Sequence, residues 1–263
     1  MKLIALLTDY GLSDHYVGVI KGVIKGISPK TEIIDITHEV KAYDVRDGAF
    51  LLLQASKFLP RDCVVVAVVD PGVNTRRRAI AVETKERVYL GPDNGLLYPA
   101  ASREGIVSVY DIGKGPHVLS DSTTFAGRDI FAPAAAHVSS GTALSSLGRK
   151  VSGMAVMELT GAMFTEDAVE GMILHIDRFG NAVSNIEGDS FHRWSRGASL
   201  FRLRSGYKVA KVRLVSSYQE IRGVGLVVGS GGTLEVSGRE ERPDVVLSPT
   251  GRFSIERDGK RTH

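Results

Sequence analysis

In the first 150 residues, short apolar runs alternate with segments whose apolar residues recur at helical spacing. The run CVVVAVVD at 63–70 is the clearest buried strand, and the segment at 14–27 is the clearest amphipathic helix. Further strands are expected at 3–8, 31–37, 79–84, 87–93 and 107–112, and further helices at 42–60, 94–105 and 128–141. This alternation predicts an α/β domain whose mainly parallel sheet carries helices on both faces.

The pattern changes after residue 153. From residue 169 onward, short β runs separated by Gly and Ser dominate, and no long helical segment is found. Such spacing indicates an antiparallel barrel or sandwich. We therefore expect an α/β domain at 1–152, a connector at 153–168 and an all-β, barrel-like domain at 169–263.

The composition is that of an ordinary globular protein, with 43% apolar and 24% charged residues. The formal net charge of +3 is too small to indicate nucleic-acid binding. The densest basic run, at 76–78, offers a small anion site at most, and a solvated turn is the simpler interpretation.

The single cysteine, Cys63, excludes an intramolecular disulfide and fits a reducing compartment. The N-terminal apolar run at 3–7 is too short for a signal sequence or a membrane span, and no later segment approaches one. We therefore expect a cytoplasmic protein without a membrane partner.

Three predicted strands end on or just before an acidic residue: Asp9, Asp70 and Asp93. Any one of them is as readily a turn cap. Because ligands collect at the carboxyl ends of parallel strands, three acids on one sheet should share an edge and favour a binding site there. Asp9 in TDYG is suited to accept hydrogen bonds from a vicinal diol such as a ribose.

Asp70 precedes Arg77 by seven residues across a Pro-Gly turn. If the turn folds back, the two side chains form a charge-assisted pair in which Arg77 keeps Asp70 ionised. The alternative is a structural ion pair that closes a hairpin, and the pattern alone slightly favours it.

Common cofactor motifs are absent from the sequence. The seven histidines show neither HxH nor HExxH spacing, and no GxGxxG, Walker or GxSxG segment occurs. Magnesium on Asp9 and Asp14 is conceivable, but the paired Asp-Asp that such a site usually needs is missing. We expect no metal and no cofactor.

The second half carries two polar turns. In HIDRFGNAVSNI, an acid such as Asp177 can bind a ligand ammonium and an amide such as Asn181 can recognise a purine edge, although a plain hairpin turn explains the same residues. The glycines of GSGG at 229–232 allow close backbone approach or simply form a tight turn.

Six segments occur in a recognisable order: TDYGLSDHYVG, IIDITHEV, VVDPGVNTRRRAI, GPDNGLL, TFAGRDIFAPAAAH and IDRFGNAVSNI. Together they resemble the S-adenosylmethionine hydrolase (adenosine-forming) family, the S-adenosylmethionine hydroxide adenosyltransferases, which is related to the fluorinase and chlorinase. The resemblance implies an α/β N-domain, a β-barrel C-domain and a homotrimer. It also implies that S-adenosylmethionine binds between one subunit's N-domain and its neighbour's C-domain.

The implied reaction is attack of water or hydroxide on the ribose C5′, which yields adenosine and methionine. Its main requirements are alignment and desolvation of the nucleophile, because the methionine thioether is a good leaving group. By motif, the implied substrate contacts are Asp9 on the ribose hydroxyls, Asp14 and Asp177 on the methionine ammonium, Asn181 on the adenine, Tyr43 and Phe179 as pocket walls, and Ser230 on the methionine carboxylate.

Asp70 and Arg77 match two members of the family's water-handling triad, but Ala126 occupies the position of the third, a histidine. His137 cannot replace it, because nine helical residues place it about 13 Å beyond Arg128. A second departure is GREERPDVV at 238–246, where the family closes over adenine with small residues.

These features leave three functions open. The first is a hydrolase, impaired by the missing imidazole. The second is an S-adenosylmethionine or adenosine-binding protein with little turnover. The third is a halogenase, which Asp70 disfavours because a carboxylate repels a halide.

Overall fold

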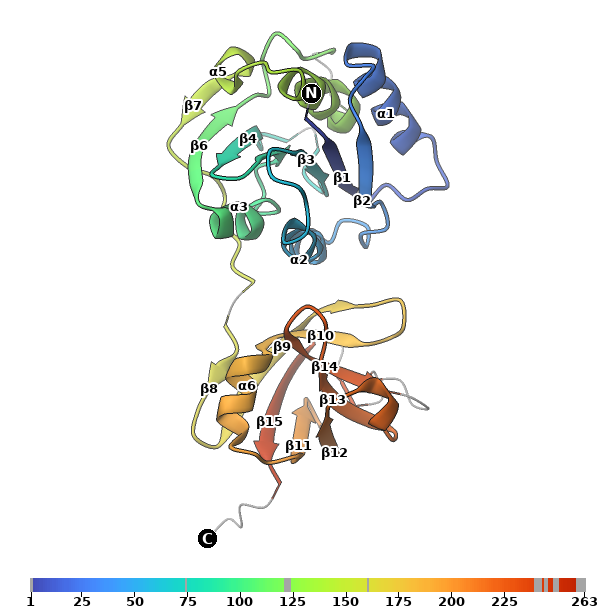
Figure 1. The fold of residues 1–263 in the computed structure, drawn as a ribbon, viewed down its shortest axis with the longest axis vertical. Coiled ribbons are helices and arrows are strands. Elements are labelled where there is room, and N and C mark those ends of the chain that lie inside the picture. Colours follow the sequence, from blue (N-terminus) through green and yellow to red (C-terminus); the bar gives the residue numbers. More distant parts are fainter. Residues whose placement is uncertain are drawn as a thin grey trace. The chain divides into compact units, whose positions relative to one another are not determined.

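The computed structural model describes residues 2–73, 75–120, 124–159, 161–238, 243, 246–247 and 251–258. The chain divides into two compact units, Met1–Glu158 and Leu159–His263, called unit 1 and unit 2 below (Figure 1). Each unit has its own buried apolar core. No helix among the described residues combines the length and hydrophobicity that crossing a bilayer requires.

Unit 1 is built on a mixed seven-stranded sheet with the order β2-β1-β3-β5-β4-β6-β7. The strands β2, β1, β3 and β5 pair in parallel, whereas β4, β6 and β7 form antiparallel pairs. The prediction of a mainly parallel sheet is therefore wrong. The bounds are β1 (Ile4–Thr8), β2 (Ile33–Thr37), β3 (Val64–Val68), β4 (Ala79–Thr84), β5 (Val88–Pro92), β6 (Ile106–Asp111) and β7 (Arg149–Val151).

The reversal occurs at β4 and has a simple cause in chain length. Only residues 85–87 separate β4 from β5. Parallel neighbours need a crossover of about a dozen residues, so a three-residue connection produces a hairpin. Strand β6 pairs with the other side of β4, and β7 pairs with β6. Both of these pairs are also antiparallel.

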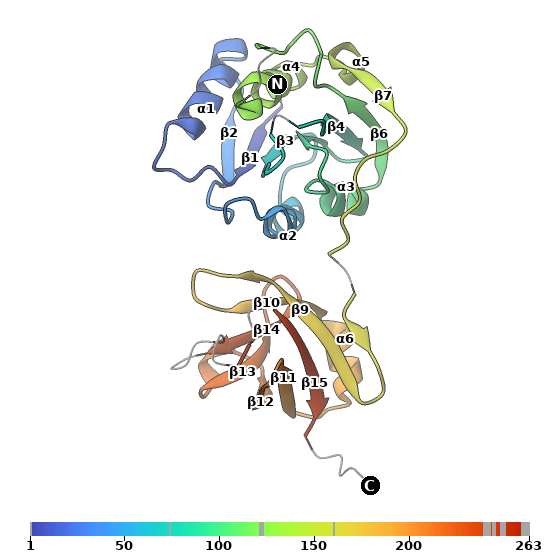
Figure 2. The same cartoon turned by 180° about the vertical axis from the view of Figure 1, so that it is seen from behind.

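Helices cover both faces of the unit 1 sheet, as the sequence predicts. Helices α1 and α4 pack together on one face, and α2 and α3 lie on the other (Figures 1 and 2). Val17, Ile20 and Ile24 of α1 are buried, which matches the predicted apolar stripe. The bounds are α1 (Tyr16–Ile27), α2 (Val45–Ser56), α3 (Tyr98–Glu104), α4 (Ala132–Ser139) and the short α5 (Leu144–Leu147).

Unit 2 is a closed barrel of seven strands in the order β10-β14-β13-β12-β11-β15-β9, and a β9–β10 pairing completes the ring. The predicted barrel-like domain is therefore confirmed. Every neighbouring pair is antiparallel except β12 and β13. The bounds are β8 (Met163–Phe164), which pairs beside β9, then β9 (Ala168–Ile176), β10 (Ala182–Glu187), β11 (Leu200–Ser205), β12 (Lys208–Val215), β13 (Val224–Val228), β14 (Thr233–Gly238) and β15 (Arg252–Arg257).

Unit 2 also contains one helix of eight residues, α6 (Gly188–Ser195), so it is not purely β. Its sequence holds only two large apolar residues, Phe191 and Trp194, which gives a weak periodic signal. Their rings pack 5.2 Å and 6.1 Å from the ring of Phe201 on β11. Tertiary packing rather than local propensity therefore stabilises this helix.

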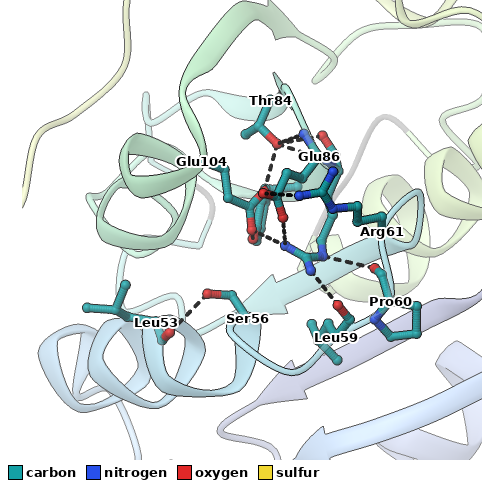
Figure 3. A network of polar contacts seen from close by, with 10 residues as sticks. Leu53, Ser56, Leu59, Pro60, Arg61, Thr84, Glu86 and Glu104 are labelled. Carbon is teal, nitrogen blue, oxygen red and sulfur yellow. Dashed lines mark hydrogen bonds and ion pairs between the residues drawn. The ribbon is translucent and has the colours of Figure 1, made fainter. Parts of the chain in front are cut away.

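A buried ion-pair network joins the amino ends of β3 and β5 in unit 1 (Figure 3). Arg87 precedes β5 and pairs with Glu104 of α3, and both side chains are about 95% buried. The Arg87 Nε donates to the Pro60 carbonyl at 3.0 Å, while the Thr84 hydroxyl donates to Glu104 at 2.7 Å. The hydroxyl of Tyr89 also donates to Glu104, so every charge in the network has polar partners.

Replacing Glu104 with Gln should therefore destabilise unit 1 strongly. The substitution removes the buried counter-ion of Arg87 and leaves only the partly exposed Glu86, 3.2 Å away, and we expect the free energy of unfolding to fall by about 3 kcal/mol. Urea unfolding followed by circular dichroism measures the change. Arg61→Gln is the control, because Arg61 is 79% exposed and its contact with Glu86 is long, at 3.4 Å. Equal losses in the two variants would contradict the role given to the buried pair.

Candidate functional site

The carboxyl ends of β1, β3 and β5 meet at one edge of the unit 1 sheet, because these strands are adjacent and parallel. Asp9 directly follows β1, Asp70 lies two residues beyond β3, and Asp93 directly follows β5. The topology therefore brings the three predicted carboxylates to the same edge.

Asp70 and Arg77 form a bidentate ion pair at this edge. The Arg77 Nε donates to one carboxylate oxygen of Asp70 at 2.8 Å, and a terminal guanidinium nitrogen donates to the other. The Asp70 side chain is only 6% exposed and that of Arg77 is 14% exposed. Arg77 also lies over the ring of Phe131, 5.9 Å from its centre. Desolvation and two charge-assisted bonds fix both side chains in one orientation.

Asp93 is occupied by structural contacts. Its carboxylate accepts a hydrogen bond from the Arg78 Nε at 2.8 Å and another from the backbone N–H of Ala155 at 2.6 Å. Arg78 in turn donates to the Gly153 carbonyl at 2.9 Å. These bonds hold the segment at 153–155 against the sheet edge, so the simpler interpretation, a structural acid, fits Asp93.

Asp9 is held by the backbone of Tyr43. The Tyr43 N–H donates to Asp9 Oδ2 at 2.9 Å, and Tyr43 adopts a left-handed φ of +66°. A bulky residue rarely adopts this conformation, and such strain is concentrated at functional sites. Burial raises the pKa of Asp9; the Tyr43 N–H opposes the rise, and the nearby charge of Asp70 adds to it. Asp14 is exposed in the bend between β1 and α1.

The segment around Ala126 begins with an unusual turn. Residues Gly127–Phe131 form one turn of π-helix, which continues as α4. Pro133, near the start of α4, has no N–H to donate to the Asp129 carbonyl four residues earlier. The Leu119 N–H donates to that carbonyl instead, at 2.9 Å. Single π-helical turns within helices are common at functional sites.

The Arg-Asp pair in this turn is local. The guanidinium of Arg128 donates to both carboxylate oxygens of Asp129, at 2.7 Å and 2.9 Å. Ala126 is buried in the core of unit 1, with 3% of its surface exposed. His137 lies in the last turn of α4. The pair Arg128 and Asp129 therefore shapes the turn rather than offering a free acid or base.

A cavity of about 1250 Å³ opens beside Arg77 on unit 1. Five cationic residues line it against a single acid, Asp111; the five are Arg76, Arg77, Arg78, Lys114 and Arg149. The basic run at 76–78 thus lines a hollow instead of a simple solvated turn. The positive field of such a lining attracts anions.

In unit 2, Asp177 and Asn181 belong to the turn between β9 and β10. Asp177 accepts hydrogen bonds from the N–H groups of Phe179 at 2.9 Å and Asn181 at 2.8 Å, and from the Asn181 side-chain amide at 2.8 Å. The Asn181 amide is therefore partly engaged, not free as the sequence suggested. Phe179 projects outward and is 86% exposed.

Glu235 is a buried acid of unit 2 that sequence analysis missed. It lies on β14, is 6% exposed and accepts a hydrogen bond from the Tyr218 hydroxyl at 2.8 Å. A Cβ on Gly229 would lie 1.7 Å from its carboxylate, so Gly229 and the turn carrying the exposed Ser230 lie directly against Glu235. The one charged residue in the apolar strand TLEVS was the available signal.

Burial raises the pKa of Glu235; the Tyr218 hydroxyl lowers it, and the nearby charge of Asp177 raises it. Burial, together with the hydrogen bond to Glu235, raises the pKa of Tyr218 to about 12. Two carboxylates that repel each other favour a cation between them. Within the described residues, no group of three or more His, Cys, Asp or Glu side chains is arranged to hold a metal ion.

Two family models match the chain and cover most of it. The SAM hydroxide adenosyltransferase N-terminal domain matches residues 4–148, and the C-terminal domain of the same name matches residues 171–247. The chain belongs to the SAM hydroxide adenosyltransferase family. The resemblance drawn from the six ordered motifs is therefore confirmed.

Members of the SAM hydroxide adenosyltransferase family and their relatives match over most of the length of both chains. The (R)-S-adenosyl-L-methionine hydrolase of Methanocaldococcus jannaschii is 34% identical over 246 residues, 90% of this chain and 88% of that one. The hydrolase of the same name from Thermus thermophilus is 37% identical, over 71% and 75% of the two chains. A fluorinase from an Actinoplanes species is 25% identical, over 70% and 71%.

A solved structure agrees with this membership in the SAM hydroxide adenosyltransferase family. An uncharacterized conserved protein of Thermotoga maritima superposes with a TM-score of 0.88 at 35% identity, covering 97% of this chain and all of that one. Most of the segment at 238–246, the second departure from the family pattern, lies outside the described residues.

Tyr218→Phe should raise the pKa of Glu235 further above its ordinary value of 4.5, because the variant loses the donor that stabilises the carboxylate. When the folded-state pKa of a group lies above the unfolded one, stability falls as pH rises from the lower value to the higher. Because the folded-state pKa of Glu235 is higher in the variant, the fall in stability should continue to a higher pH. Carbon-detected NMR titration of the glutamate carboxyls measures the shift. Tyr207→Phe is the control, since Tyr207 is 92% exposed. An unchanged Glu235 titration in Tyr218→Phe would refute this account.

Proposed function

We propose that this protein hydrolyses S-adenosyl-L-methionine to adenosine and L-methionine. The main structural support is the buried, bidentate Asp70–Arg77 ion pair at the carboxyl edge of the sheet. Relatives at 34% and 37% identity are named (R)-S-adenosyl-L-methionine hydrolases, which supports the same chemistry for this chain.

In the proposed reaction, the oxygen of a water molecule attacks the ribose C5′ from the side opposite the sulfonium. The new bond joins that oxygen to C5′, and the C5′–S bond breaks with its electron pair going to the methionine sulfur. Asp70 accepts a proton from the water, and Arg77 fixes the orientation of the carboxylate. Because the leaving thioether is neutral, the reaction needs neither a cofactor nor a metal.

The substrate contacts follow from the family motifs. We propose that Asp9 binds the ribose hydroxyls, because its half-buried carboxylate can accept hydrogen bonds beyond the one from the Tyr43 N–H. The mutual repulsion of Asp177 and Glu235 supports an ammonium ligand near Asp177. The remaining proposed contacts are Asp14 on the ammonium, Asn181 on the adenine, Ser230 on the carboxylate, and Tyr43 and Phe179 as pocket walls.

We further propose a cytoplasmic homotrimer in which one copy supplies the unit 1 residues of each site and another copy the unit 2 residues. The exposure of two proposed wall residues supports this arrangement: Tyr43 is 72% exposed and Phe179 is 86% exposed within the single chain. Rings this exposed are free to contact a ligand or another copy of the chain.

The second candidate is a binding protein with little turnover, and Ala126 is the observation that favours it. A methyl group cannot move a proton, and losing one member of a catalytic set commonly lowers the rate by about two to four orders of magnitude. Halogenation is disfavoured by the carboxylate of Asp70, which would repel an incoming halide.

Incubation with S-adenosyl-L-methionine in oxygen-18 water, with and without chloride, separates the three functions by mass spectrometry. Adenosine that carries the label supports hydrolysis. Bound substrate without product supports the binding protein, and 5′-chloro-5′-deoxyadenosine would overturn the assignment. Asp70→Asn is the control for a contaminating enzyme, because the Asn variant should lose at least about a hundredfold in kcat.

Ala126→His should raise kcat by about tenfold or more, because an imidazole restores the third member of the water-handling triad with Asp70 and Arg77. Steady-state adenosine release measures the change, and thermal unfolding checks that the buried position accepts the ring. Ala135→His is the matched control, because Ala135 is also a buried alanine and lies in α4, beyond the π-helical turn. An unchanged rate in a folded Ala126→His variant would refute the placement of the triad.

A further inference from the structure

Tyr10 directly follows Asp9, and its side chain reaches the segment that carries Ala126. Its ring packs edge-on against Phe125, 5.5 Å between centres. A Cβ on Gly127 would lie 2.7 Å from the Tyr10 hydroxyl oxygen, so the hydroxyl rests against the backbone of the residue next to Ala126. The glycine is needed here because any larger side chain would displace the phenol.

The same hydroxyl lies within electrostatic range of the Asp70–Arg77 pair. Burial raises the pKa of Tyr10; the charges of Asp9 and Asp70 raise it further, and Arg77 opposes them. The phenol therefore stays protonated at neutral pH and is available as a hydrogen-bond donor. No residue in the part of the chain that the structure describes shares a hydrogen bond with this hydroxyl.

We propose that the Tyr10 hydroxyl takes the place of the missing imidazole and orients the attacking water between Asp70 and position 126. The inference rests on the proposed hydrolysis and deepens it by naming a further residue of the same site. The proposal is based on two positions. The hydroxyl lies against Gly127, the residue next to Ala126, and Tyr10 itself directly follows Asp9.

The proposal assigns a partner to one water proton and to each oxygen lone pair, while the second proton stays on the oxygen and becomes the hydroxyl hydrogen of adenosine. The Asp70 carboxylate accepts one water proton, and the Tyr10 hydroxyl donates to one oxygen lone pair. The second lone pair is then directed at C5′ and forms the new bond. Tyr10 keeps its own proton throughout, so it directs the water and does not act as the base.

The obvious alternative is that Tyr10 only packs, since it belongs to an aromatic cluster with Phe125 and Tyr16. Tyr10→Phe separates the two roles, because it keeps the ring and removes only the hydroxyl. Tyr16→Phe is the matched control: Tyr16 lies 5.2 Å from Phe125 in the same cluster but is 39% exposed.

The experiment compares kcat and KM for S-adenosyl-L-methionine in the full-length protein and both variants. Tyr10→Phe should lower kcat by about tenfold to a hundredfold with KM within about twofold, since it removes one oriented donor. Tyr16→Phe should change neither. In the Ala126→His background, Tyr10→Phe should cost less than about threefold, because the imidazole then holds the water.

Three outcomes would overturn the inference. If Tyr10→Phe turns over as fast as the parent protein, the hydroxyl has no role in the reaction. If the loss is equally large with His at position 126, or if Tyr16→Phe loses as much, the effect comes from packing. If the parent protein binds the substrate but forms no labelled adenosine in the oxygen-18 experiment, the proposed hydrolysis itself is refuted.

Discussion

The ion pair of Asp70 with Arg77 is the contact on which the carboxyl edge of unit 1 depends. Asp9 and Asp70 follow adjacent strands, and their negative charges raise the cost of holding a half-buried carboxylate beside a buried one. The guanidinium offsets that cost with two charge-assisted bonds and lies over Phe131 of the π-helical turn. One arginine therefore links the β3–β4 connection to the segment that carries Ala126.

Two backbone features adjoin this pair, and both depart from regular structure. Tyr43, whose N–H donates to Asp9, adopts a left-handed conformation, and a π-helical turn directly follows Ala126. Each departure costs folding energy that the surrounding core must supply. In exchange, the backbone around the site has few alternative conformations, which favours a fixed geometry for a reaction that depends on alignment.

Much of this could be predicted from the sequence. The apolar runs located the strands, and the acids that end them marked the edge where they meet, because strand ends and sheet edges follow local rules. The direction of β4 depends on a three-residue connection, and α6 on packing against Phe201, which periodicity does not report. The engaged amide of Asn181, the buried Glu235 and the position of the Tyr10 hydroxyl arise from contacts that only the folded chain creates.

The buried network of Arg87 and Glu104 lies at the amino ends of β3 and β5, whose carboxyl ends lead to Asp70 and Asp93. The anchor and the proposed reaction site thus lie at opposite edges of one sheet. A chain built this way tolerates change at the reactive edge, since exchanging an imidazole for a methyl group at position 126 leaves the far anchor intact. Such a division lets a lineage alter its rate, or its reaction, through single substitutions without first acquiring a compensating stabilising mutation.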